Sequence, residues 1–286
     1  MVSIVTSFNG YHESQGSIAS LIDGLDGVAN FLNNAAAKKS QMRKLAGYTV
    51  LAGVLGAIVG AGIDITALFG VGLLLILGGI VVLIYSLFGG QTFSQHRWRL
   101  DVAKQRLAMI QEDAKADAQF SMHVTLAAVR KLLSDEKIPQ HKKKGKQQFY
   151  EESWLTIEGP LRDGTSLSDE IKELTRTRSY TNARGKSKSK TRTQYLTAIR
   201  FSYPKKVYGD ATGPAKGLPD PVRVPRHVSL RAVRVTEKAI LLKAMAQSKD
   251  DLVQTLGALS MAAYRILNLA RQVAASQPGN TKGEAK

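Results

Sequence analysis

The chain lacks cysteine and has almost no charge over one long stretch. The absence of cysteine in 286 residues excludes disulfides and thiolate metal sites. Between Lys44 and His96 the only charged side chain is Asp64. The first 40 residues are polar or amphipathic and lack the basic start and cleavage site of a removable signal peptide, so we expect none.

Two apolar runs, 45–62 and 66–89, fill the uncharged stretch. Each is close to the ~20 residues that a helix needs to cross the ~30 Å hydrocarbon layer of a membrane. The core of a soluble protein is the alternative interpretation, but uninterrupted apolar runs of this length are rare there. The sequence therefore predicts a transmembrane helical hairpin over 45–92, which makes the lipid bilayer the first expected partner.

Basic residues flank the predicted hairpin on both sides, while its turn has none. By the positive-inside rule this asymmetry places both termini in the cytoplasm, in a membrane of the bacterial inner-membrane type. The flanking cations are Lys38, Lys39, Arg43 and Lys44 before the hairpin, and Arg97, Arg99, Lys104 and Arg106 after it.

Positive charge is concentrated after the hairpin. Residues 94–286 contain 36 Lys or Arg and 19 Asp or Glu, which accounts for the net charge of +17 of the whole chain. A basic domain beside an anionic leaflet gains roughly 1 kcal/mol for each Lys or Arg near the surface, and it also attracts nucleic acid non-specifically. Charge alone does not choose between these partners.

Small residues recur at helical spacing within both apolar runs. They let helix backbones approach closely in a membrane, where association depends on close packing rather than on the hydrophobic effect. They either hold the two helices of the hairpin together or leave a second stripe for homo-oligomerisation, and the pattern resembles that of glycine-zipper hairpins. The candidate helix-packing residues are Ala52, Gly56 and Gly60 in the first run, with a parallel ladder at Gly53, Ala57 and Ala61, and Gly72 and Gly79 in the second.

The fold class predicted for the whole chain is a membrane-anchored α+β protein. It has a two-helix, glycine-rich transmembrane hairpin, a long helical stalk, and a basic cytoplasmic domain with a small antiparallel sheet and a C-terminal amphipathic helix. The expected segments are an amphipathic N-terminal segment 1–44, the hairpin 45–92, the stalk 93–136, a basic linker 137–148, an α+β domain 149–276 and a disordered tail 277–286. Strands are expected at 149–158, 171–180, 191–203 and 228–235.

Two of these segments carry apolar residues at coiled-coil spacing. The predicted stalk has Leu100, Ala103, Leu107, Ile110 and Ala114, and continues through Ala118, Met122, Leu126, Val129 and Leu133. The C-terminal helix, which we expect to begin at a cap formed by Ser248, has Leu252, Leu256, Leu259, Ala263, Ile266, Ala270 and Val273. Such a seam requires a partner, and we expect the two helices to pair with each other or to self-associate.

The most specific local pattern is a basic arm between two predicted strands. One parity along a strand lies on one face, so alternate cations give a two-stranded ribbon with a single cationic face. Such a face suits anionic lipid or nucleic acid; protection of a strand edge and a solvated loop without a dedicated role are the alternatives. The candidate anion-binding residues, all at even positions, are Arg176, Arg178, Arg184, Lys186, Lys188, Lys190 and Arg192.

No motif indicates catalysis, a metal or a cofactor. The segment 184–187 resembles the end of a phosphate-binding loop, but position 180 is Tyr180 where such a loop has glycine. The five histidines show no metal-ligand spacing, and no nucleophile elbow occurs. We therefore expect a protein that is not an enzyme.

The leading functional hypothesis is a membrane-anchored scaffold or adaptor. Its basic cytoplasmic domain would bind a protein partner that the sequence does not identify, or an anionic surface of lipid head groups or nucleic acid. The alternative is an oligomeric, membrane-perturbing or pore-forming effector gated by its cytoplasmic domain.

Overall fold

The computed structural model divides the chain into two compact units. The first, here called the sheet domain, contains residues 1–25 and 98–286, and the second, here called the helical pair, contains residues 26–97. The residues described are 3–7, 11–62, 66–88, 96–127, 130–138, 145–181, 185–217 and 222–276. The predicted tail 277–286 lies outside them, as does the turn that contains Asp64.

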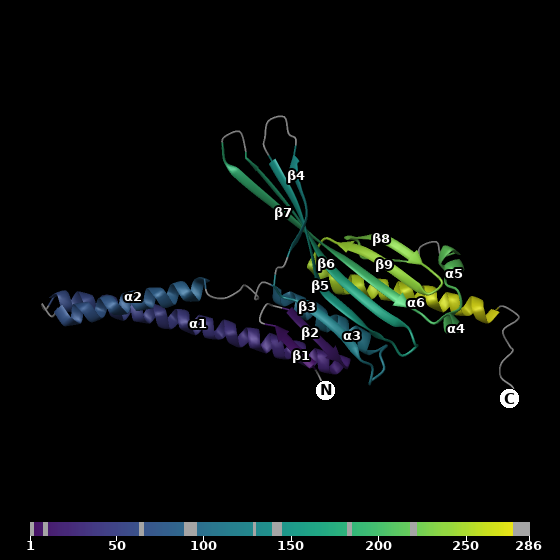
Figure 1. Ribbon diagram of the computed structural model, residues 1–286, viewed down its shortest axis with the longest axis horizontal. Helices are drawn as coiled ribbons and strands as arrows, with labels where there is room; N and C mark the ends of the chain where they lie inside the picture. The colour runs from purple at the N-terminus through teal and green to yellow at the C-terminus, as the bar shows by residue number, and fades with distance from the viewer. Residues whose placement is uncertain are drawn as a thin grey trace. The chain divides into compact units, whose positions relative to one another are not determined.

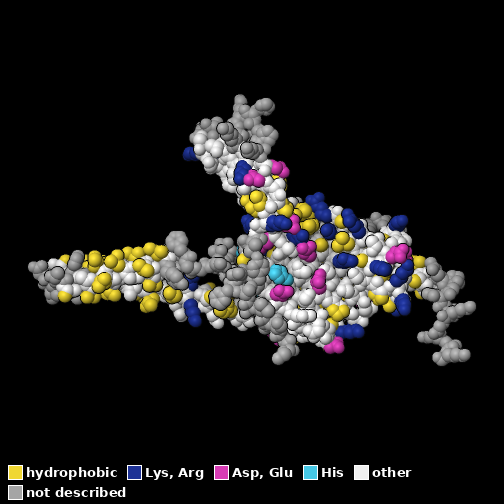
Figure 2. Space-filling view, in the orientation of Figure 1, with side chains coloured by type: hydrophobic (Ala, Val, Ile, Leu, Met, Phe, Trp, Pro, Cys, Tyr) yellow, Lys and Arg dark blue, Asp and Glu magenta, His cyan; other side chains and the backbone are white. Residues whose placement is uncertain are grey.

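Two long helices form the helical pair. Helix α1 extends over Ile18–Gly62, so that its first turns belong to the sheet domain, and α2 extends over Thr66–Phe88. Figure 1 draws the two helices side by side, and Figure 2 shows that much of their surface is apolar. Ser17 caps the start of α1, because its hydroxyl accepts a hydrogen bond from the Ser20 amide at 3.3 Å.

Helix α1 is long and apolar enough to cross a membrane by length and composition. Its most apolar window has a mean hydropathy of 1.8, and 17% of that window is buried. Among the residues described it is the one helix that meets both requirements, and the apolar stretch Gly70–Ile84 of α2 is shorter. This one helix is compatible with a membrane span, whereas the predicted transmembrane hairpin remains a prediction.

The sheet domain is built on a mixed α+β plan, as predicted. Its described strands form one antiparallel sheet in the order β1-β2-β3-β5-β6-β7-β9-β8, with β4 paired to β5. The strands are β1 Ser3–Ser7, β2 Tyr11–Gly16, β3 Phe120–Thr125, β4 Lys131–Ile138, β5 Gly145–Pro160, β6 Ser166–Thr181, β7 Ser187–Ser202, β8 Val228–Val235 and β9 Ala239–Ala246. The helices are α3 Arg97–Gln111, α4 Lys205–Tyr208, α5 Thr212–Gly217 and α6 Leu252–Ser276, with a 3-10 turn η2 at Lys249–Asp251.

Helices cover one face of this sheet and leave the central strands open on the other. In β6 the odd-numbered residues from Leu167 to Thr175 are buried, and the even-numbered ones are partly exposed. Helix α6 packs on β7 and β9 and runs along the sheet in Figure 1. Helix α3 lies on the same face, because Arg106 contacts both Asp169 of β6 and Ser260 of α6. The core therefore lies between the odd-numbered face of β6 and these two helices.

The predicted C-terminal helix is present, but its partner is not the one expected. The Ser248 hydroxyl accepts a hydrogen bond from the Asp250 amide at 3.2 Å, which confirms Ser248 as the cap. The predicted seam is buried from Leu252 to Ala270, whereas Val273 is 44% exposed. A seam at this spacing also suits a helix lying on a sheet, and α6 does so instead of pairing along a long stalk.

The long stalk over 93–136 is wrong. Helix α3 ends at Gln111, and the chain then returns to the sheet through an isolated bridge between Ala114 and Leu161. The Arg162 amide donates to the carbonyl of Asp113 at 2.8 Å, a contact made by residues distant in sequence. From Phe120 onward apolar residues occupy every second position, and β3 buries Phe120, Met122 and Val124. The period of two decides the structure here, although Ala118, Met122 and Leu126 also fit a period of four.

The basic linker 137–148 also needs correction, and the amphipathic N-terminal segment 1–44 contains two strands before its helix. Lys137 and Ile138 end β4, and residues 145–148 belong to β5, which pairs with β6 on its other edge. The remainder of the linker, 139–144, lies outside the described residues. Strands β1 and β2 precede α1, and β2 pairs with β3. The sheet is therefore much larger than the small one predicted.

Candidate anion-binding interface

Four strands extend beyond the helix-covered part of the sheet as an arm. The arm consists of β4 and of residues 145–151, 175–181 and 187–193 of β5, β6 and β7, and it is visible in Figure 1. The β6–β7 hairpin confirms the predicted antiparallel pair. Because β5 and β4 add two strands to it, the arm is a small sheet rather than a two-stranded ribbon.

The register places the predicted cations opposite one another. Arg176 pairs with Arg192 and Arg178 pairs with Lys190, while Lys188 lies opposite Tyr180. Directly opposed residues share a face, so these five cations form one cationic face across β6 and β7. Lys186 is exposed just before β7, and Arg184 lies outside the described residues.

Two neighbours from β5 support the base of this face. The Arg176 guanidinium donates to Gln147 Oε1 at 2.6 Å and lies 5.7 Å from the centre of the Phe149 ring. In the register of β5 and β6, Gln147 lies opposite Arg178 and Phe149 lies opposite Arg176. These contacts hold Arg176 while leaving its side of the strand exposed.

The opposite face of the hairpin carries hydroxyl groups instead of charge. Cross-strand pairs link Thr177 to Thr191 at 3.4 Å and Ser179 to Ser189 at 3.5 Å. Neither face of this part of the arm belongs to an apolar core, so core packing does not explain why these strands extend so far. The charges are thus segregated on one side of a folded element.

The cationic face continues into the open face of the central sheet. Both use the even positions of β6 and β7, and Arg200 extends the series on β7. Two carboxylates of this face share one cation, because the Lys172 ammonium lies 2.9 Å from Glu151 and 3.3 Å from Glu170. Together these three side chains carry a single negative charge. One side of the domain therefore presents mostly uncompensated positive charge.

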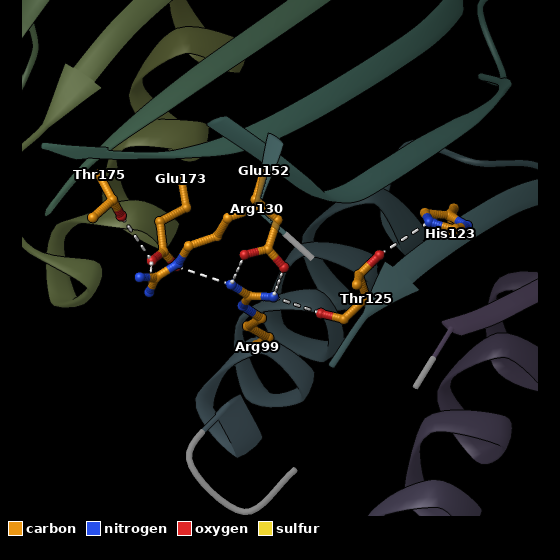
Figure 3. Close-up of polar contacts among 7 residues, drawn as sticks. All are labelled: Arg99, His123, Thr125, Arg130, Glu152, Glu173 and Thr175. Carbon is orange, nitrogen blue, oxygen red and sulfur yellow. Dashed lines mark hydrogen bonds and ion pairs between the residues drawn. The ribbon is translucent and has the colours of Figure 1, made fainter. Parts of the chain in front are cut away.

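Beneath the sheet, buried charges form a closed network rather than a reactive site (Figure 3). Arg99 of α3 is fully buried and donates to Glu152 at 2.7 and 3.1 Å and to Glu173 at 2.9 Å. It also donates to the Thr125 carbonyl at 2.8 Å, and Arg130 contacts Glu173 at 3.3 Å. Each carboxylate is occupied by guanidinium groups, so neither is a free general base.

Burial also shifts the pKa of other titratable groups of the domain. Burial and the nearby Glu173 carboxylate raise the pKa of Tyr195 to about 12. Burial also raises the pKa of Asp169, because the facing Arg106 offsets only part of the loss of solvation. Among the residues described, no group of three His, Asp or Glu side chains is placed to hold a metal ion.

The predicted helix-packing residues occupy different environments in the helical pair. A Cβ atom at Gly72 would lie 2.7 Å from the Gly53 carbonyl oxygen, and one at Gly79 would lie 2.6 Å from the Val50 side chain. A Cβ at Gly56 would make an ordinary 3.8 Å contact with Gly72. Gly60 is buried, and Ala52 is exposed. The close contacts of Gly72 are therefore with Gly53 and Ala57, both from the parallel ladder.

Three cations of the open central sheet, Arg200, Arg234 and Lys243, were not among the predicted site residues. Arg200 shares the even parity of the arm, and this signal was available within the predicted strand 191–203. Lys243 lies on β9, which was not predicted as a strand, and its neighbour Arg234 on β8 has meaning only once β8 and β9 are paired.

Comparisons with protein-family models, with curated proteins and with solved structures found no match for this chain.

Proposed function

We propose that this chain is a membrane-anchored scaffold or adaptor whose basic domain binds an anionic surface, either lipid head groups or nucleic acid, or a protein partner. The observation that carries the proposal is the segregation of five cations on one face of the arm. The function is binding rather than catalysis, and both termini lie on the cytoplasmic side of a membrane of the bacterial inner-membrane type.

The expected electrostatic binding energy supports the cationic face as a binding surface. Each Lys or Arg held near an anionic leaflet contributes roughly 1 kcal/mol, and five of them on one plane act together. Tyr180 is the one aromatic residue of the β6 and β7 parts of the arm that the structure describes. Single-strand recognition relies on stacking of bases on aromatic rings, so lipid or the backbone of a duplex fits this face better.

The helical pair supports the anchoring part of the proposal. Helix α1 meets the length and composition of a membrane span, and α2 packs against it through glycines. In the proposed arrangement both helices cross the bilayer as a hairpin. The tether then keeps the basic domain beside the leaflet, so weak surface contacts suffice because the second contact is intramolecular.

Capture of vesicles by the reconstituted full-length chain tests the proposal. The chain is placed in nanodiscs of neutral phosphatidylcholine and mixed with vesicles that contain anionic or only neutral lipid. We expect flotation with the anionic vesicles alone, decreasing as salt rises from about 50 to 200 mM because counterions screen the contact. A labelled DNA duplex measures the nucleic-acid alternative in the same buffers. Absence of salt-sensitive binding to either would remove the anionic-surface part of the proposal.

The decisive variant combines Lys188→Gln, Lys190→Gln and Arg192→Gln. The control combines Lys115→Gln, Arg265→Gln and Arg271→Gln, which remove the same charge from exposed positions outside the arm. We expect the arm variant to lose at least tenfold in vesicle affinity and the control to lose less than threefold. Equal losses would mean that net charge, and not the arm, determines binding.

The membrane arrangement has its own test. Because the chain has no cysteine, a single cysteine placed at Ser7 or at Ser276 reports the side of the membrane to which it is exposed. In intact spheroplasts we expect neither to react with a membrane-impermeant maleimide, and both to react after lysis. Labelling of either position in intact spheroplasts would contradict the proposed orientation.

A further inference from the structure

The open face of the central sheet contains a shallow hollow distinct from the arm. Its volume is about 360 Å³, and β6, β7, β8 and β9 all contribute to it. The depression exists because Ala198 and Ala239 have small side chains, and Leu241 between them forms an apolar floor. Ser168, Glu170, Arg200, Arg234, Thr236 and Lys243 complete the lining.

Three cations surround this floor in a fixed register. Arg200 and Arg234 both pair with Leu241, one from each neighbouring strand, and Lys243 pairs with Ala198. Two strand spacings of ~4.8 Å put the backbones of the two arginines roughly 10 Å apart. That span lets both guanidinium groups bend toward one compact group above Leu241.

The charges of the hollow are not balanced from within the protein. Among the described residues, Arg200, Arg234 and Lys243 have no ion-pair partner. The carboxylate of the lining, Glu170, is occupied by Lys172 at 3.3 Å and by Ser153 at 3.0 Å. Ser168 donates to Glu158 and Thr236 bonds within its own turn, so the three cations are the free donors. Figure 2 shows dark-blue side chains with apolar ones between them over β8 and β9.

We propose that this hollow binds a phosphate monoester group, carried by a lipid head group or free in solution. Arginine presents a planar fork of donors that matches phosphate oxygens, and lysine adds a point charge. A phosphate monoester has up to two negative charges on three oxygens, which the three cations of the lining would neutralise. Leu241 and the two alanines offer an apolar surface to the carbon atoms next to the phosphate. The site differs from the arm in its concave shape and in the small ligand that it accepts.

Calorimetry with two soluble probes tests this site on the full-length chain in nanodiscs of neutral phosphatidylcholine. The probes are inorganic phosphate and dihexanoyl phosphatidic acid below its micelle concentration, with dihexanoyl phosphatidylcholine and empty nanodiscs as blanks. We expect both probes to bind, and the lipid to bind more tightly if the apolar floor contributes. Equal affinities assign the free phosphate as the ligand source, because the acyl chains then add nothing.

Variants of the two arginines decide the outcome. We expect Arg200→Gln and Arg234→Gln each to reduce affinity for the probe at least tenfold, because each removes a charged donor from the phosphate. The control, Lys188→Gln with Lys190→Gln in the arm, should leave affinity for the soluble probes unchanged, even though it weakens vesicle capture. Binding that is absent, that matches the phosphatidylcholine blank, or that is insensitive to both arginine variants would overturn the proposal. Circular dichroism confirms that each variant is folded.

Discussion

Arg106 Nε donates to Asp169 Oδ2 at 2.6 Å, and both side chains are buried. The same guanidinium donates to Ser260 at 2.8 Å, so one residue of α3 joins β6 and α6. Asp169 Oδ1 has no hydrogen-bond partner, which leaves this carboxylate dependent on Arg106 alone. Through these two contacts Arg106 links α3 to the sheet and to α6 on the same face.

Loss of Arg106 should therefore be costly. We expect Arg106→Met to lower the free energy of unfolding of the sheet domain by about 3–5 kcal/mol, since it strands a buried carboxylate. Adding Asp169→Leu should recover much of this loss, because the uncompensated charge is gone. Urea denaturation followed by fluorescence of Trp98 and Trp154 measures the effect.

A surface pair provides the comparison for this prediction. Lys205 and Glu237 form an exposed ion pair at 3.0 Å, and Lys205→Met should leave stability unchanged within error. If Arg106→Met were as mild as Lys205→Met, the buried pair would not be what holds α3 to the sheet.

His12 should make the sheet domain sensitive to acid. Its side chain is 3% exposed, neither ring nitrogen has a hydrogen-bond partner, and burial together with the nearby His123 lowers its pKa. The unfolded chain then binds the proton more readily than the folded one. The stability contributed by neutral His12 is fully present above the unfolded pKa of 6.5, and is lost as pH falls from there through the lowered folded pKa.

Denaturation at pH 7.5 and at pH 5 tests this sign. We expect the loss of stability between these values to be smaller in His12→Gln than in the unmodified chain, whatever the effect of the substitution at pH 7.5. His227 is exposed, and His227→Gln should keep the original pH dependence. An unchanged pH dependence in His12→Gln would show that other groups cause the acid sensitivity.

Most elements that carry their own local signal were predictable from the sequence. Ser248 and the apolar seam of α6 mark that helix, and the alternating cations mark β6 and β7. Strand β8 also lies at the predicted bounds, Val228 and Val235, although most of its residues are exposed. In α6, β6 and β7 the spacing of the side chains matches the period of the backbone over enough residues to exclude the other type of element.

Elements defined by distant contacts were not predictable in this way. Helix α3 ends without glycine or proline where the Asp113 carbonyl meets the Arg162 amide, and no nearby residue indicates that contact. Met122 satisfies both a period of two and a period of four, so only its pairing with Ile157 of β5 decides between strand and helix. The hollow beside Arg200 likewise depends on the pairing of β7 with β9, which are separated by β8 in the sequence.

Close packing of the helical pair should depend on Gly72. A Cβ atom there would lie 2.6 Å from the Ala57 amide nitrogen and 2.7 Å from the Gly53 carbonyl oxygen, and neither backbone atom can move without shifting the helix. We expect Gly72→Ala to separate α1 from α2. In detergent micelles, amide hydrogen exchange of the facing segments should then become faster.

Gly70 is the matched control for this prediction. It lies on the same helix, and a Cβ atom added to it would meet nothing within 4 Å. Gly70→Ala should therefore leave exchange unchanged or slow it slightly through better helix propensity. Similar exchange in both variants would mean that the glycine contact does not hold the helices together.

The direction in which the arm presents its charge should matter as much as the amount. A charge-conserving variant exchanges Lys188 with Ser189 and Lys190 with Thr191, which moves two cations to the hydroxyl face. In the folded domain that face points to the side of α3 and α6, whereas the original face continues into the open sheet near Arg200. We expect vesicle affinity to fall about 30-fold for two displaced cations, at roughly 1 kcal/mol for each cation removed from the leaflet. Flotation at constant salt measures this, and the exchange of Thr177 with Arg178 on β6 provides an independent repeat. Full binding by both exchanged variants would mean that the arm binds vesicles without a preferred face. It would also mean that the open face of the central sheet does not contact the vesicle together with the arm.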